Sequence, residues 1–450
     1  MTSVPQHYEQ STVDGIRIVS ERVPSARSVS VGVWIGVGSR HERDGERGWA
    51  HFVEHLLFKG NERIDATAIS RFFDGIGSDA NAATTKEYTV LHSRVLERHL
   101  ADTLGMFGEM VWHPAFESGD VDSERDVILE EIAMYADSPS DVVHELGDEL
   151  VYGDHPLALP IVGTTESISS AVASDIADFH KSRYVHDRIV VSAAGAIDHA
   201  DLVALVRERF LAGVEPRETR MARAVERPAA SATPASGHAV QTDDSEQVHM
   251  CLTWPGIARG DDRRFTLTVL DTLFGSTPGS RLFVEVRELR GLAYSVYSFQ
   301  SSYVVGGQLG IYVGVRPERV GETLDVLATE LERLRNEPPT LEEVTRAQDH
   351  LEGRTVLSME SSTVRGNRLG AALVNEQPIE SLDEALAKIR AVTPANVQSL
   401  ARELFDPAML SFAAVAENPD DVVAAAVKAF GVSADAIAVR EPLHGQGAPA

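Results

Sequence analysis

Three residues whose types suit metal chemistry stand within five positions of one another in the segment 49–60, WAHFVEHLLFKG. They are His51, Glu54 and His55. On a helix, at about 100° per residue, His51 and His55 project about 40° apart and Glu54 about 60° to the other side of His51. Two imidazoles one turn apart can share a Zn2+ ion. The carboxylate beside them can take a proton from a water molecule that the metal has acidified.

The same pattern has a plainer explanation as two core histidines that are hydrogen-bonded to a buried glutamate. Apolar residues surround the three polar ones nearly all round the helix, so we expect this helix to be buried. Buried polar groups cost free energy unless they have partners. A His-x-x-Glu-His pattern arises by chance in roughly one chain in twenty of this composition. A third ligand is therefore needed before the pattern predicts a metal site.

The segment 120–136, DVDSERDVILEEIAMYA, is a second predicted helix and supplies that ligand. Glu124 and Glu131 fall on its apolar face by the spacing of three and four residues, whereas Glu130 points about 100° away. We therefore predict Glu131 as the third ligand and Glu124 as the group that orients a ligand. A buried carboxylate paired with an arginine remains the alternative for Glu131. His144, on the next predicted helix, fits a structural or exposed histidine better than a ligand.

The elements that must position these residues occur in two similar sets. Each half of the chain opens with an alternating strand, at 28–37 and 247–256, which a charged loop follows. Strand pairs followed by runs of helices predict the α+β class, here as two similar domains with antiparallel-rich sheets flanked by helices. The long helices are predicted near 96–112, 121–136, 140–151, 318–335 and 341–357.

The domain boundaries follow from composition. A chain of 450 residues is expected to form two or three domains. The segment 225–240 is rich in Ala, Pro, Ser and Thr and is the predicted linker. It separates a metal-binding domain, 1–224, from a domain at 241–450 that has no His-x-x-Glu-His pattern. We interpret the second domain as a catalytically empty copy of the first.

Charge and cysteine content exclude several classes of protein. A net charge of −27 argues against nucleic-acid binding, which needs basic patches. The single cysteine, Cys251, rules out an internal disulfide and a thiolate-rich metal site, so a tightly bound metal must use histidines and carboxylates. Residues 1–11 lack the pattern of a signal segment, and no run is apolar enough to span a bilayer. We expect a cytoplasmic protein without membrane contact.

The motifs resemble those of the pitrilysin/insulinase family of zinc peptidases, which carry an inverted His-x-x-Glu-His motif and a distal glutamate. Residues 51–55 match the motif, and Glu131 stands 76 positions after His55, which is the family's spacing. Glu124 matches the family's second acid. The resemblance implies one Zn2+ per chain, held by His51, His55 and Glu131. It also implies a zinc-dependent endopeptidase in which Glu54 is the general base.

Two further segments carry the resemblance across most of the chain. Residues 77–89 are similar to the family's edge strand, which pairs with the substrate backbone, so Asn81 and Ala82 are implied to line the substrate groove. Residues 280–298 are similar to the family's substrate clamp. By that similarity, Arg287 and Tyr294 donate hydrogen bonds to the scissile carbonyl.

The resemblance also implies an assembly. Larger relatives carry four such domains and close like a clamshell, whereas a two-domain chain resembles the processing-peptidase-like branch and implies a homodimer. A closed chamber implies short or unfolded peptides as substrates. The negative charge favours basic ones if it lies on the chamber wall, and the alternative is that it serves solubility alone. The alternatives are a non-catalytic subunit, the catalytic half of a heterodimeric processing-peptidase-like complex, and a metal-storing or scaffold protein.

Overall fold

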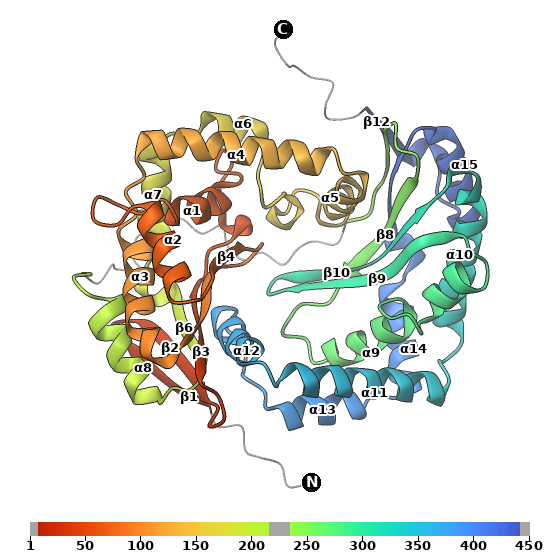
Figure 1. The fold of residues 1–450 in the computed structure, drawn as a ribbon. Coiled ribbons are helices and arrows are strands. Elements are labelled where there is room, and N and C mark those ends of the chain that lie inside the picture. Colours follow the sequence, from red (N-terminus) through yellow and green to blue (C-terminus); the bar gives the residue numbers. More distant parts are fainter. Residues whose placement is uncertain (1–7, 216–234, 442–450) are drawn as a thin grey trace. The chain divides into compact units, whose positions relative to one another are not determined.

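The structure is a computed structural model that describes residues 8–215 and 235–441 (Figure 1). These residues form two compact units, each built on a six-stranded sheet. The first unit contains residues 8–132, 160–215 and 355–383, and the second contains 133–159, 235–354 and 384–441. Among the described residues, no helix combines the length and the apolar character that crossing a membrane requires.

The first sheet has the strand order β1-β2-β6-β3-β5-β4. Neighbouring strands are antiparallel apart from β2 and β6, which are parallel. Strand β4 is therefore an edge strand, hydrogen-bonded to β5 alone in this sheet. The strands are β1 (Tyr8–Val13), β2 (Ile16–Arg22), β3 (Ser28–Ile35), β4 (Ala80–Thr84), β5 (Thr89–Leu96) and β6 (Ile189–Gly195).

The second sheet has the strand order β12-β7-β11-β8-β10-β9. The pairs β12–β7 and β7–β11 are parallel, and the others are antiparallel. The strands are β7 (His238–Thr242), β8 (Val248–Gly256), β9 (Ala293–Tyr303), β10 (Gly306–Val315), β11 (Ser411–Ala416) and β12 (Ile437–Arg440).

The two sheets repeat one topology over five strands. The edge hairpin β4–β5 corresponds to β9–β10, the central strand β3 to β8, and the parallel pair β2 and β6 to β7 and β11. Only the sixth strand differs, because β1 pairs antiparallel with β2 whereas β12 pairs parallel with β7. The prediction of two similar α+β domains with antiparallel-rich sheets is confirmed, and the predicted opening strands are β3 and β8.

Helices cover one face of the first sheet, and strand β3 explains why. Its residues alternate, so that Val29, Val31, Val33 and Ile35 face the helices while Trp34 faces the other side. The elements of this unit's helical layer and its loops are η1 (Ser39–His41), α1 (Trp49–Leu57), α2 (Ala66–Gly75), η2 (Glu97–His99), α3 (Leu100–Trp112), α4 (Ser118–Ala136, whose last four residues belong to the second unit), α6 (Thr165–Ser170), α7 (Ala173–Arg183), η4 (His186–Arg188), α8 (His199–Leu205) and the π-helical turn η5 (Val206–Phe210).

The second unit has its own helical layer around Phe274, Phe405 and Phe412, which are fully buried. Its helical elements are η3 (Pro156–Ala158), α9 (Arg264–Phe274), the π-helical turn η6 (Phe283–Glu288), η7 (Pro317–Arg319), α10 (Val320–Asn336), α11 (Leu341–Ser358, whose last four residues belong to the first unit), α13 (Leu382–Arg390, which begins in the first unit), α14 (Pro394–Leu404), η8 (Pro407–Met409), α15 (Pro419–Phe430) and η9 (Ala434–Ala436). The predicted long helices correspond to α3, α4, α5 (Pro139–Tyr152), α10 and α11.

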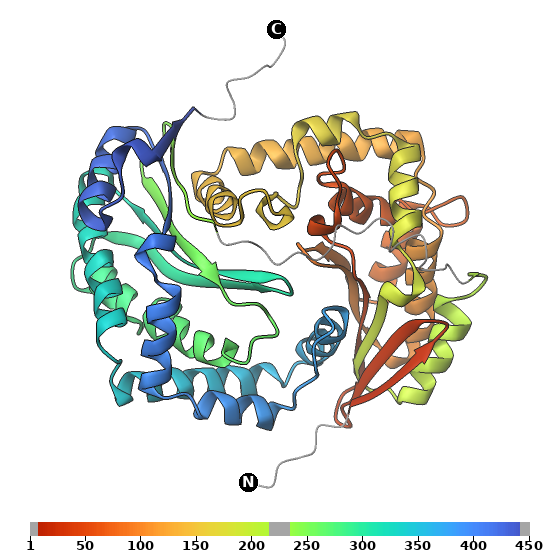
Figure 2. The same cartoon turned by 180° about the vertical axis from the view of Figure 1, so that it is seen from behind.

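A helix from the other half of the sequence covers the opposite face of each sheet. Helix α12 (Ser362–Val374) packs on β2, β3 and β6, which Figures 1 and 2 both display, and Gly370 lets it lie directly on Trp34. Helix α5 (Pro139–Tyr152) packs on β8 and β11 in the second unit. The expected domain boundaries at 224 and 241 divide the chain in sequence order. In the structure, α12 from the second half of the chain belongs to the first unit, and α5 from the first half belongs to the second unit. Residues 225–234 of the expected linker, 225–240, lie outside the described residues.

Candidate metal centre

Helix α1 is fixed by its apolar side. Phe52, Val53 and Leu57 are fully buried, and Leu56 is 2% exposed. Helix α1 also packs on β4, β5 and α7. The side chains of His51, Glu54 and His55 project from the remaining face and are half-buried. The predicted buried helix is therefore present, with its three polar residues on one side.

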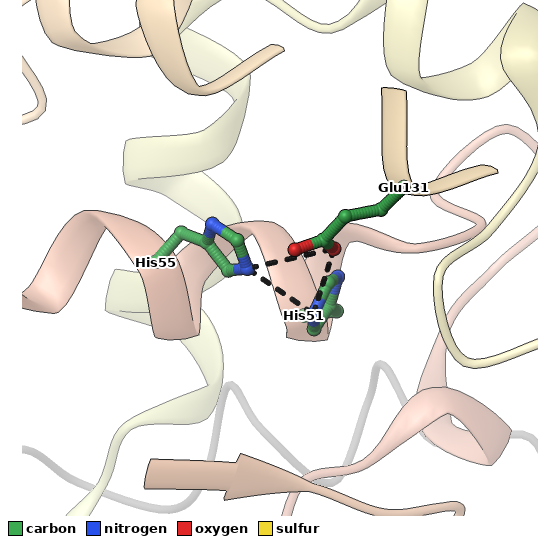
Figure 3. Close-up of side chains that lie close together, drawn as sticks. All are labelled: His51, His55 and Glu131. Carbon is green, nitrogen blue, oxygen red and sulfur yellow. Dashed lines mark hydrogen bonds and ion pairs between the residues drawn. The ribbon is translucent and has the colours of Figure 1, made fainter. Parts of the chain in front are cut away.

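His51 and His55 converge with Glu131 of helix α4 (Figure 3). The two Nε2 atoms are 3.2 Å apart. The Oε2 atom of Glu131 lies 3.7 Å from Nε2 of His51 and 3.9 Å from Nε2 of His55. Within residues 8–215 and 235–441, this is the only group of three or more His, Cys, Asp or Glu side chains close enough to hold a metal ion.

Glu124 and Lys59 support His55 from behind. The Nδ1 atom of His55 donates a hydrogen bond of 2.9 Å to Oε2 of Glu124, and Oε1 of Glu124 pairs with Lys59. Burial alone would raise the pKa of Glu124, but hydrogen bonds from Lys59 and His55 outweigh it and lower that pKa. Glu124 is therefore a carboxylate near neutral pH, as a hydrogen-bond acceptor for His55 must be.

The chemistry of these donors fits a divalent metal such as zinc. Since the Nδ1 proton of His55 points at Glu124, its Nε2 lone pair faces Glu131 and His51. Burial, and then the neighbouring His55, lower the pKa of His51 to about 4, so this imidazole is neutral at pH 7. Two imidazoles and one carboxylate leave a fourth position open, as catalytic zinc sites do.

Glu54 lies beside this group with its own partner. The hydroxyl of Thr84, at the end of β4, donates a hydrogen bond to Oε2 of Glu54. Burial raises the pKa of Glu54, and the hydrogen bond from Thr84 opposes this increase. A carboxylate with a raised pKa is suited to accept a proton and release it again.

Strand β4 carries the two residues expected in the substrate groove. Asn81 is exposed, and its Oδ1 atom accepts a hydrogen bond from the backbone N–H of Ala82. Ala82 packs against the core of the first unit, on the same side of the strand as Thr84. On the side of β4 that faces Glu54, a ligand can therefore contact only the backbone of the strand and every second side chain.

In the second unit, Arg287 and Tyr294 lie together. The guanidinium of Arg287 on η6 donates a hydrogen bond of 3.0 Å to the backbone oxygen of Tyr294 on β9. Its central carbon lies 4.8 Å from the centroid of the Tyr294 ring, which gives a cation–π contact. The Tyr294 side chain is 81% exposed and free to contact a ligand.

Sequence reasoning missed Lys59 and Thr84. Lys59 stands four positions after His55, just beyond the end of α1, so a spacing of one helical turn could have pointed to it. Thr84 contacts Glu54 through tertiary packing, for which the sequence carries no signal. His144 hydrogen-bonds Tyr297 and lies outside the candidate metal centre, in agreement with a structural role.

Comparisons with known proteins identify the family to which this chain belongs. The family model described as Insulinase (Peptidase family M16) matches residues 17–165, and the model described as Peptidase M16 inactive domain matches residues 170–351. The chain belongs to the insulinase family, peptidase family M16, and the predicted family is confirmed.

Similar proteins carry consistent names. An uncharacterized zinc protease of Streptomyces coelicolor is 39% identical over 391 residues, covering 87% of this chain and 85% of the relative. The uncharacterized zinc protease YmxG of Bacillus subtilis is 36% identical, covering 87% of this chain and 94% of the relative. A protease from Helicobacter pylori has the same fold, with a TM-score of 0.85 at 21% identity over 91% of this chain and 99% of that one.

Proposed function

We propose that this chain is a zinc-dependent endopeptidase that cleaves short or unfolded peptides, with one Zn2+ per chain held by His51, His55 and Glu131. The observation that carries the proposal is the convergence of these three side chains beside Glu54. Glu54 stands next to His55 on the same helix, so a water molecule held near the metal lies within reach of its carboxylate.

The residues divide the chemistry among them. A bound zinc ion supplies Lewis acidity, which lowers the pKa of water and polarises a carbonyl group. Glu54 accepts the proton of the attacking water and passes it to the leaving amine. Thr84 holds the carboxylate of Glu54 in position through its hydroxyl. Glu124 and Lys59 hold His55 in the tautomer that presents Nε2 to the metal.

Strand β4 binds the peptide by strand addition. An edge strand offers unpaired backbone N–H and C=O groups, and an extended peptide satisfies them without a requirement for a particular sequence. The backbone at Asn81 and Ala82 would form these hydrogen bonds. Most backbone groups of a folded protein are already hydrogen-bonded within its own helices and sheets, which favours short or unfolded peptides as substrates.

Arg287 and Tyr294 complete the site as a clamp. Their guanidinium and hydroxyl groups donate hydrogen bonds to the scissile carbonyl as its oxygen gains negative charge. Two chains pair as a homodimer, so that the second domain of each chain supplies Arg287 and Tyr294 across the dimer to a closed chamber. The net charge of −27 favours basic peptides there.

The test is hydrolysis of a quenched fluorescent, unstructured basic peptide by the wild type and by Glu54→Gln, with zinc content measured on both. We expect the wild type to cut, and the variant to bind zinc equally without cutting. Glu130→Gln, on the exposed side of α4, is the matched control and should keep full activity. A wild type that binds zinc stoichiometrically and does not cut would instead identify a non-catalytic subunit or one half of a heterodimer.

A further inference from the structure

Helix α1 begins at a glycine that cannot cap it. Gly48, the N-cap residue, has φ of 85°. A Cβ atom there would lie 2.5 Å from the backbone oxygen of Val162 and 2.8 Å from the Cα of Gly163. The usual N-cap residues, Ser, Thr, Asp and Asn, are therefore sterically excluded at this position. The free N–H groups of the first turn must find their acceptors elsewhere.

Glu42 supplies those acceptors from six residues earlier. Its Oε2 atom accepts the backbone N–H of Gly48 at 2.9 Å, and its Oε1 atom accepts that of Ala50 at 2.8 Å. The backbone oxygen of Glu46 accepts the N–H of Trp49. Glu42 is 3% exposed, so water does not compete for these hydrogen bonds.

The same loop is attached to the substrate side of the site. The N–H groups of Ser39 and Arg40 donate to the backbone oxygens of Thr85 and Lys86, in the turn between β4 and β5. Gly38 packs against that turn so closely that a Cβ atom would lie 2.3 Å from the oxygen of Thr85. One short segment, 38–50, therefore joins the end of β4 to the start of α1.

We propose that Glu42 is a positioning residue for the candidate active site: it fixes the first turn of α1 and so sets Glu54 and His51 relative to strand β4. The inference rests on the proposed peptidase function. The relevant distance is that between Glu54 and Thr84, because one residue lies on α1 and the other directly before the turn that the loop grips. A shift of α1 along its axis changes the distance between Glu54 and Thr84 without removing any of the metal ligands.

The experiment compares Glu42→Gln with Glu46→Gln in the full-length zinc-loaded protein at a pH above about 8, where Glu42 is ionised and both of its oxygens accept hydrogen bonds. Glutamine at 42 keeps the shape but turns an amide NH2 group towards one of the two N–H donors. Glu46 lies in the same loop, where its side chain pairs with Arg183 and accepts the N–H of Arg43. It is the matched control, because its side chain does not bond to α1. Three quantities are measured: kcat and KM for the fluorescent peptide, the zinc dissociation constant by chelator competition, and the melting temperature.

For Glu42→Gln we expect kcat to fall about tenfold to a hundredfold with KM nearly unchanged, since a misplacement of about 1 Å costs that much. We also expect zinc to bind several-fold more weakly. Glu46→Gln should lower the melting temperature without either effect. Equal kcat and zinc affinity in wild type and Glu42→Gln would overturn the proposal, even if the variant melts earlier.

Two safeguards separate the possible failures. If Glu42→Gln does not fold, Glu42→Asp replaces it, because aspartate keeps the carboxyl group but draws it back by one methylene. A reduced kcat at unchanged KM in Glu42→Asp supports the positioning role, and a wild-type kcat refutes it. If the wild type shows no hydrolysis, the peptidase proposal fails, and the zinc dissociation constants alone decide the role of Glu42.

Discussion

The imidazole of His55 donates its Nδ1 proton to the carboxylate of Glu124 over 2.9 Å, on the side away from His51 and Glu131. This one hydrogen bond selects the tautomer that presents the Nε2 lone pair to a metal. Lys59 pairs with the other oxygen of Glu124 and keeps it charged. The candidate metal centre therefore depends on residues that do not themselves contact the ion.

Replacing Glu124 by glutamine should weaken zinc binding by about tenfold to a hundredfold, because the outer hydrogen bond on a histidine ligand typically contributes that much. The glutamine amide can donate where a carboxylate only accepts, so His55 loses its fixed tautomer. Chelator competition measures the dissociation constant. Glu130→Gln, on the same helix but exposed, should leave it unchanged. Equal affinities of wild type and Glu124→Gln would contradict the role of Glu124.

Replacing Thr84 by valine should move the acidic limb of the kcat/KM profile to higher pH. Burial raises the pKa of Glu54, and the hydrogen bond from the Thr84 hydroxyl lowers it. Its removal therefore raises that pKa further. The general base works only when deprotonated, so activity appears at a higher pH than in the wild type. Thr84→Ser keeps the hydroxyl and should keep the wild-type profile; an unchanged profile in Thr84→Val would count against Glu54 as the base.

Glu42 should make the stability of the protein depend on pH. Burial raises the pKa of Glu42 from 4.5 to about 8, although hydrogen bonds from Ala50 and Gly48 act in the opposite direction. The folded protein thus binds this proton more tightly than the unfolded chain. Its contribution is fully present below pH 4.5 and is lost as the pH rises to about 8, by at most about 1.4 kcal/mol per pH unit.

Denaturant unfolding at about pH 5 and about pH 8 measures this contribution. From about pH 5 to about pH 8, the free energy of unfolding should fall more in the wild type than in Glu42→Gln, because glutamine does not titrate. The comparison uses the change with pH, so the constant cost of the altered helix cap cancels. Parallel pH dependences in the two proteins would contradict the raised pKa.

Helix α12 should depend on one buried carboxylate. Glu21 on β2 is 3% exposed and pairs with Arg365 and Arg368 of α12. Glu21→Gln leaves two arginines without their counter-charge and should lower the free energy of unfolding by about 2 kcal/mol. This cost is smaller than that of breaking a fully buried pair, because both arginines are partly exposed. Denaturant unfolding measures it. Glu322→Gln, which breaks the exposed pair with Arg319, should cost less than about 1 kcal/mol. Equal small costs would contradict the anchoring role.

Tyr294→Phe should lower kcat while leaving KM and zinc content near their wild-type values. The hydroxyl is proposed to act on the oxyanion, which exists only in the transition state. The ring remains to stack on Arg287, so the arginine keeps its position. Tyr297→Phe removes a hydroxyl from the same strand and serves as the control. Equal kcat in wild type and Tyr294→Phe would remove this residue from the proposed mechanism.

The local geometry of helices and strands accounts for much of what could be predicted from the sequence. The spacing of His51, Glu54 and His55 places them on one side of a helix wherever that helix lies, because the rotation per residue is fixed. The same reasoning put Glu131, and not Glu130, on the inward face of its helix, and the structure brings Glu131 to the two histidines. The alternation in β3 predicted a strand with two different faces, and the repeat of that pattern at β8 predicted the duplicated domain.

Tertiary packing alone decided the rest. Glu42 reaches the start of α1 because Gly48 leaves no room for a capping side chain, and Val162 and Gly163, more than a hundred residues away, impose that restriction. Thr84 meets Glu54, and helices α5 and α12 cover the sheets of the other half, through contacts between distant segments. Such contacts are set by the shape and burial of whole surfaces, which no local spacing in a sequence encodes.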